Sequence, residues 1–92
     1  MTSNKIIVSV LGMDRVGIIA AVTNTLAGAN ANILDISQTI LEGFFTMIMV
    51  VDISPANVDF PELKEQLEQT GTDLGVQINA QNSSVFEFMH RL

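Results

Sequence analysis

The stretch Leu11–Gly17 constrains the fold most, because it joins two segments of different periodicity. Residues 5–11 are rich in β-branched side chains and predict a mostly buried strand. Apolar residues then recur at helical spacing, which predicts an amphipathic helix from Val16 or Gly17 to Ala29. A strand that turns directly into a helix leaves the first N–H groups of the helix without internal partners. Such a corner suits a small carboxylate.

Two residues of this stretch have specific expected roles. Asp14 is expected to accept hydrogen bonds from the helix as its cap, and Gly17 lets the backbone approach a neighbour or a ligand closely. The motif is weakly specific alone, since a capped turn with no ligand explains the same residues. On these residues alone, the capped turn is the preferred interpretation.

The next segment predicts an edge strand. Asn30 is expected to end the first helix in the left-handed conformation, and residues 33–41 form the second strand. Its polar side indicates an edge position or a face open to water. The expected alternation places Leu34, Ile36, Gln38 and Ile40 on one side, and Asp35, Ser37 and Thr39 on the other. Whether Asp35, Ser37 and Gln38 line a groove between subunits or a solvated edge stays open.

A hairpin and a central strand follow. Glu42 and Gly43 form a two-residue turn, so the second strand should pair directly with residues 44–51. This third strand is apolar on both faces, as expected of a central strand covered from two sides. Its Met47 and Met49 are interpreted as adaptable core residues.

A second helix is marked by its start signals. Asp59 is an acidic cap, Pro61 lies in the first turn, and Glu62 occupies the capping-box position. The helix is expected to run through Gly71, which would mark a close approach to the first helix, and to stop at Gly75. Phe60, Leu63, Leu67 and Leu74 fall on its apolar face.

The element order defines the fold class. Residues 76–81 alternate as a fourth strand, which completes the order βαββαβ. We predict an α+β ferredoxin-like sandwich, with an antiparallel sheet of strand order 4-1-3-2 and both helices on one face. Residues 1–81 form this domain. Residues 82–92 form a C-terminal helical extension, with a capping box at Ser84 and an apolar stripe that packs on the bare sheet face or on a partner subunit.

Composition excludes several functional classes. The 92 residues contain no Cys, carry a net charge of −6 and are 48% apolar. These values exclude disorder, disulfides and thiolate metal sites, and they argue against nucleic-acid binding. The apolar runs are too short to span a membrane and no signal segment is present, so a cytoplasmic protein is expected. The single histidine, His90, is expected to have a structural role at a helix end. We expect neither a metal, nor a cofactor, nor a catalytic nucleophile–base pair.

The motifs resemble those of a known family. Residues 10–20, Asn32–Ile33 and residues 35–39 are similar to an ACT domain, the small amino-acid-sensing module of many metabolic enzymes and regulators. The likeness extends to Gln81. Residues 86–90 resemble the tail of short stand-alone ACT proteins of bacteria and archaea, whose function is largely unassigned. Val16 replaces a proline usual in the loop, and Asn30 replaces a glycine. These departures leave the fold unaffected and the ligand open.

The resemblance implies a binding site at a subunit interface. ACT domains commonly pair side by side into a continuous eight-stranded sheet, with a small amino acid between the first loop of one subunit and the second strand of the other. A homodimer with a non-enzymatic regulatory role is therefore expected, with an unidentified protein partner possible. The implied site residues are Asp14, Arg15, Val16 and Gly17 from the loop, and Asn32 and Ile33 from the strand.

Each implied residue has a role that its chemistry allows. Backbone N–H groups near Val16 and Gly17 would bind the ligand carboxylate, and the Asn32 amide offers a donor and an acceptor. Asp14 either caps the helix or meets the α-ammonium group. Arg15 either pairs with a carboxylate or, as preferred for this residue alone, makes an unimportant surface ion pair.

Three alternative functions use the same fold. An acylphosphatase-like enzyme is rejected, because residues 12–20 do not match its anion-binding loop. An RNA-recognition motif is rejected because residues 42–49 begin with an acidic residue and lack the second aromatic. The remaining alternative is a protein–protein interaction or dimerisation module that has lost ligand binding.

Overall fold

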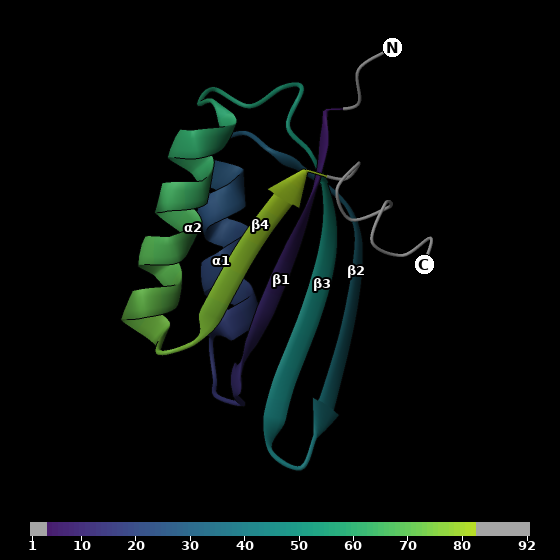
Figure 1. Cartoon of the computed structure of the whole chain (residues 1–92), viewed down its shortest axis with the longest axis vertical. Coiled ribbons are helices and arrows are strands. Elements are labelled where there is room, and N and C mark those ends of the chain that lie inside the picture. Colours follow the sequence, from purple (N-terminus) through teal and green to yellow (C-terminus); the bar gives the residue numbers. More distant parts are fainter. Residues whose placement is uncertain (1–3, 83–92) are drawn as a thin grey trace.

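The computed structural model describes residues 4–82, and within them all the expected strands and helices are present. Their boundaries lie within two residues of those expected from the sequence. Asn82 ends the last strand, so the helix expected in the C-terminal extension lies outside the described residues. The elements are β1 (Lys5–Met13), α1 (Ile18–Gly28), β2 (Asn32–Leu41), β3 (Phe44–Asp52), α2 (Phe60–Leu74) and β4 (Gln77–Asn82), as shown in Figure 1.

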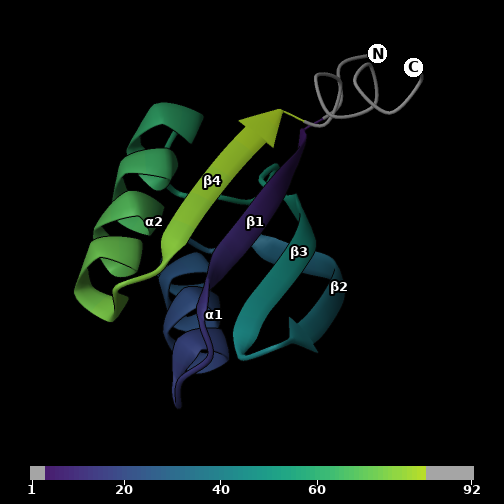
Figure 2. The ribbon, with the colours of Figure 1, turned by 60° about the horizontal axis from the view of Figure 1, so that its bottom comes forward.

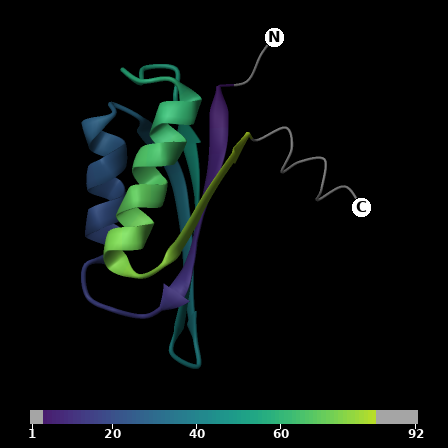
Figure 3. The same ribbon diagram turned by 60° about the vertical axis from the view of Figure 1, so that its left-hand side comes forward.

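The sheet has the predicted topology. Its strands are all antiparallel and lie in the order β2-β3-β1-β4, which is 4-1-3-2 read from the other edge. Figure 2 shows β1 and β3 in the centre of the sheet, with β2 and β4 at its two edges. Both helices cover one face of the sheet (Figure 3). The ferredoxin-like fold is therefore confirmed.

The core lies between the sheet and the helices. Val8 of β1 is opposite Met49 of β3, and Val10 is opposite Met47, so these four side chains share the helix-facing side. All four are completely buried, which confirms the two methionines as core residues. The helices contribute mainly aliphatic residues to the same cluster: Ile18, Val22, Leu26, Leu63 and Leu67.

The opposite face of the sheet is covered by no layer of the described residues. Leu11, Phe44 and Ile48 are 49%, 52% and 38% exposed on that face. The sequence predicted cover on both sides of the third strand. The helices cover one side, Ile7 is buried on the other, and cover there by the C-terminal extension or a partner stays a prediction.

The connections adopt the expected left-handed conformations. Asn30 ends α1 with a φ of 60°, and its side-chain amide donates to the Pro55 carbonyl at 2.8 Å. Glu42 and Gly43 both have positive φ, at 52° and 83°, which suits the two-residue hairpin between β2 and β3. Gly75 ends α2 with a φ of 76°.

Helix α2 begins as predicted, but its glycine has another neighbour than expected. The Asp59 carboxylate accepts from the Glu62 N–H at 3.0 Å, so the cap is confirmed. A Cβ on Gly71 would lie 2.8 Å from the Val76 carbonyl oxygen and 3.1 Å from an Ile78 side-chain carbon. The close approach is therefore to the turn after α2 and to β4. The expectation that Gly71 faces the first helix is wrong, because the β4 register places Ile78 under it.

Two glycines in the helices should respond oppositely to the same substitution. Gly71→Ala should destabilise the fold by about 1–2 kcal/mol, because the new methyl group meets a backbone oxygen that cannot move freely. Gly28→Ala meets no atom within 4 Å and should stabilise α1 by about 0.5 kcal/mol through helix propensity. Urea unfolding of both variants measures the difference. Equal effects would contradict the packing at Gly71.

Candidate functional site

The corner between β1 and α1 is attached to the β2–β3 turn. The Asp14 backbone N–H donates to the Gly43 carbonyl at 2.9 Å. Gly17 is the N-cap of α1 in a left-handed conformation, and no side chain caps the helix. The expectation that Asp14 caps α1 is therefore wrong: Asp14 lies three residues before the N-cap, and its backbone is held against the hairpin.

The first turn of α1 is open to a ligand. The hydrogen bonds of the helix begin with the Ala21 N–H, which donates to the Gly17 carbonyl at 3.0 Å. The N–H groups of Ile18, Ile19 and Ala20 precede this first bond, and within residues 4–82 no side chain accepts from them as a cap. These donors, with the positive end of the helix dipole, are suited to an anionic group.

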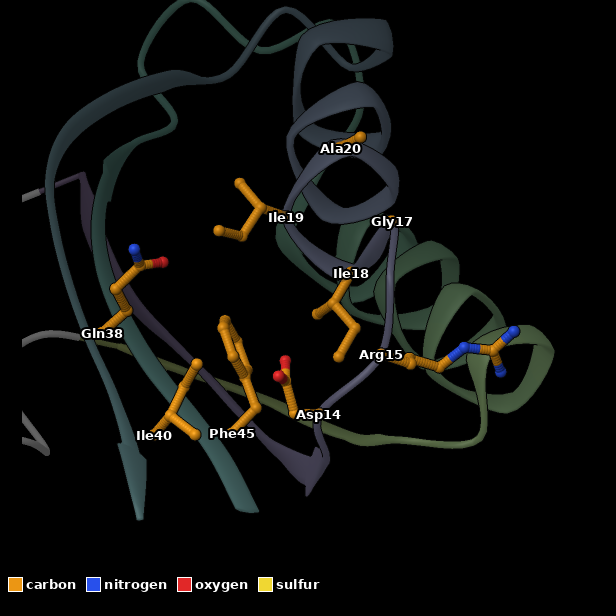
Figure 4. A pocket seen from close by; sticks show the side chains of 9 residues that line it. All are labelled: Asp14, Arg15, Gly17, Ile18, Ile19, Ala20, Gln38, Ile40 and Phe45. Carbon is orange, nitrogen blue, oxygen red and sulfur yellow. The ribbon is translucent and has the colours of Figure 1, made fainter. Parts of the chain in front are cut away.

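A cavity of about 290 Å³ lies between this corner and the edge of the sheet. Its size is near the lower end for ligand sites, which suits a small molecule. The cavity brings together residues from the loop, α1, β2 and β3 (Figure 4). They are Asp14, Arg15, Gly17, Ile18, Ile19, Ala20, Gln38, Ile40 and Phe45.

Two polar side chains of this cavity have no partner in the part of the chain that the structure describes. Neither the Asp14 carboxylate nor the Gln38 amide makes a hydrogen bond or an ion pair with another residue of the described range 4–82. Figure 4 shows the Asp14 carboxylate beside Ile18 and Phe45, with Gln38 across from Ile19. Ile19 and Ile40 are 38% and 58% exposed, so they present apolar surface.

Arg15 directs its charge away from the cavity. Its guanidinium Nη1 donates to the Leu74 carbonyl at 2.6 Å (Figure 4 shows the side chain extending away from the other lining residues). Leu74 is the last residue of α2, and the last turn of α2 contains no basic side chain. Arg15 therefore supplies the positive charge that favours this helix end. The surface ion pair expected for Arg15 is replaced, among residues 4–82, by this bond to a carbonyl, and its pairing with a ligand carboxylate stays a prediction.

The other implied site residues lie apart from the cavity within one chain. Val16 is 96% exposed and does not line it. Asn32 pairs with Asp52, at the opposite end of β2 from the turn that holds the corner. Ile33 packs against the core at that same end.

The far end of β2 has its own electrostatic feature. The Asp52 carboxylate accepts from the backbone N–H and the hydroxyl of Ser54, at 2.9 and 2.7 Å. These hydrogen bonds lower the pKa of Asp52, with a smaller contribution from Lys5. The carboxylate therefore stays ionised beside Asn32 at neutral pH.

The sequence did not assign the residues that β2 and β3 contribute to the cavity. In the sequence, Ile40 and Phe45 are indistinguishable from other apolar strand residues. Gln38 is a candidate only for a groove between subunits. The available signal was Gln38 itself, a polar residue on the apolar side of an edge strand. A β-bulge between Ile33 and Asp35 also changes the expected alternation, so that Ile33 rather than Leu34 packs on the core.

Other kinds of site find no support in the described residues. Within residues 4–82, no three His, Cys, Asp or Glu side chains gather as metal ligands would. No helix in the same range has the length and apolar character needed to cross a membrane.

The fold and this corner define a class of small α+β domains, and comparisons identify its family. The sequence matches the ACT domain family over residues 4–81. It is 54% identical to a UPF0237 protein of Methanocaldococcus jannaschii, over 97% of this chain and 99% of the relative. The chain belongs to the ACT domain family, as its motifs predicted.

Solved structures agree with this assignment. An ACT domain protein from Streptococcus pneumoniae matches with a TM-score of 0.80 and 42% identity, over 94% of this chain and 97% of that chain. The regulatory subunit of aspartate kinase from Thermus thermophilus matches with a TM-score of 0.67 and 21% identity, over 85% of this chain and 51% of that one. The second match shows a shared fold.

The bond between Arg15 and α2 can be tested by stability. Arg15→Met should destabilise the fold by about 0.5–1.5 kcal/mol, because it removes a hydrogen bond to a helix-terminal carbonyl. Lys64→Met removes the same charge from an exposed residue of α2 and is the control. Urea unfolding should separate the two variants, and equal stabilities would show that the Arg15 contact contributes nothing.

Proposed function

We propose that this chain is a non-enzymatic regulatory module that forms a homodimer and binds a small amino acid where β1 meets α1. The observation that carries the proposal is the cavity at this corner. It combines the first N–H groups of α1, which no side chain caps, with the Asp14 carboxylate, which has no partner among residues 4–82. A zwitterionic amino acid has a carboxylate for the N–H groups and an ammonium group for the Asp14 carboxylate. The family membership supports the same role, and the regulatory subunit of aspartate kinase shares the fold.

The edge strand β2 supports the homodimer. Its ten residues run along the outside of the sheet, and an edge strand presents backbone groups that can pair with another chain. The Ile36 N–H donates to the neighbouring Asp35 carboxylate at 2.9 Å, a bond that pairing with a second strand would replace. The bulge lies near the beginning of β2, so residues 35–41 offer a regular edge.

Antiparallel pairing of two β2 strands would complete the site. A twofold axis through the middle of β2 places the beginning of one strand beside the end of the other. The end of β2 leads into the turn that holds Asp14, so Asn32 and Ile33 of the second copy would approach the cavity. The separation of these residues within one chain is then a consequence of a site built by two chains.

The site chemistry assigns a role to each group. The N–H groups of α1 would bind the ligand carboxylate, and Asp14 would meet its ammonium group. The amides of Asn32 and Gln38 have donors and acceptors for either end. No residue pair in this corner provides a nucleophile with a base, which supports binding rather than catalysis.

The homodimer should depend on the backbone of β2. Ile36→Pro removes an N–H that faces away from β3, so it should convert a dimer to a monomer while the fold survives. Ile36→Thr keeps the N–H and should remain dimeric. Analytical ultracentrifugation with circular dichroism measures both. A monomeric wild-type chain, or a dimeric Ile36→Pro variant, would contradict pairing through this edge.

Amino-acid binding should appear as thermal stabilisation. Melts with each of the twenty amino acids should show at least one shift, since a ligand at 100 times its Kd adds about 2.7 kcal/mol. Gly17→Leu should abolish the shift and keep a native circular dichroism spectrum. Gly75→Leu introduces similar strain, since both glycines have positive φ and open space, but it lies outside the cavity and should keep the shift.

The absence of any shift would favour the alternative role. The chain would then act as an interaction module, for which the exposed apolar side chains of Leu11, Phe44 and Ile48 offer a surface. A shift retained in Gly17→Leu would instead place the amino acid elsewhere.

A further inference from the structure

The lining of the cavity includes an apolar surface that favours an apolar ligand side chain. Ile19, Ile40 and Phe45 come from three different elements and face one space (Figure 4). Ile19 and Ile40 are partly exposed, whereas Phe45 is 4% exposed and has a fixed position in the core. An apolar ligand group placed here would remove the isoleucine surfaces from water, which favours binding in proportion to the buried area.

The charge of the cavity favours a ligand with a cationic group. Asp14 is the one charged group among the lining residues that stays without a partner in the range 4–82, since Arg15 is bonded to Leu74. A cationic group is attracted to this carboxylate, and an acidic ligand side chain is repelled by it. The net charge of −6 increases this bias against a second negative group.

We propose that the ligand is an amino acid with a branched aliphatic side chain. Its ammonium group binds the Asp14 carboxylate, and its hydrocarbon lies against Ile19, Ile40 and Phe45. The small volume of about 290 Å³ disfavours larger molecules such as nucleotides. This inference rests on the proposed function, because it specifies the ligand of that same site.

Titration calorimetry with four amino acids tests the selection. Leucine and valine should bind, leucine at least about tenfold more tightly than alanine because of its additional methyl and methylene groups. Aspartate should produce no heat at the same concentrations. Tighter binding of aspartate or alanine than of leucine would overturn the inference.

Leucine analogues test the ammonium contact. The deaminated analogue 4-methylpentanoate should bind at least about tenfold more weakly than leucine, because it has no group for Asp14. In Asp14→Asn this difference should almost disappear. Glu65→Gln removes the same charge from the exposed surface of α2, and in this variant leucine should still bind more tightly than its analogue. Equal binding of leucine and its analogue to the wild-type chain would overturn the role of Asp14.

A pair of isoleucines tests the apolar wall. Ile40→Ala should reduce the preference for leucine over alanine, whereas Ile48→Ala, on the opposite face of the sheet, should not change it. Both residues are exposed, so neither truncation should unfold the chain. If Ile40→Ala keeps the preference for leucine over alanine, Ile40 does not contact the ligand side chain and the inference is overturned.

The two levels of the proposal fail in different ways. If no amino acid binds at all, the sensing function fails and this inference fails with it. If polar or acidic amino acids bind and leucine does not, the sensing function stands and only the aliphatic selection is overturned.

Discussion

The register between β1 and β3 determines where every other feature lies. It places Met13 opposite Phe44, so the end of β1 reaches the β2–β3 turn and the Asp14 N–H can bond to Gly43. The same register turns Met47 and Met49 toward the helices. The corner before α1 is consequently fixed against a hairpin, and the cavity exists because the helix begins beside that hairpin.

The elements and their order were predictable because local signals agreed with the global fold. Periodicity gave the strands and helices, and Asn30, Glu42–Gly43 and Gly75 marked turns that require positive φ. The cap of α2 was predictable for the same reason. Asp14 was not, because a carboxylate before a helix can cap it only if the intervening backbone brings it close.

The contents of the site depend on long-range contacts that no local pattern contains. Arg15 bonds to a carbonyl 59 residues away, and Gly71 is crowded by a strand that follows a later turn. The cavity is lined by side chains from four segments. Its apolar wall could therefore be predicted only from the register of the sheet, which sets which strand residues face the helix. The loop half of the implied site faces the cavity through Asp14 and Gly17, whereas Asn32 and Ile33 lie at the other end of β2 within one chain.

The central claim is a site at the β1–α1 corner that two copies build together. The most direct measurement is an NMR map of amide chemical shifts during titration of the labelled chain with leucine. The account predicts changes at Gly17 and Ile19, together with changes at Asn32 and Ile33 at the other end of β2. Changes confined to the sheet face opposite the helices, around Phe44 and Ile48, or no changes at saturating leucine, would contradict it.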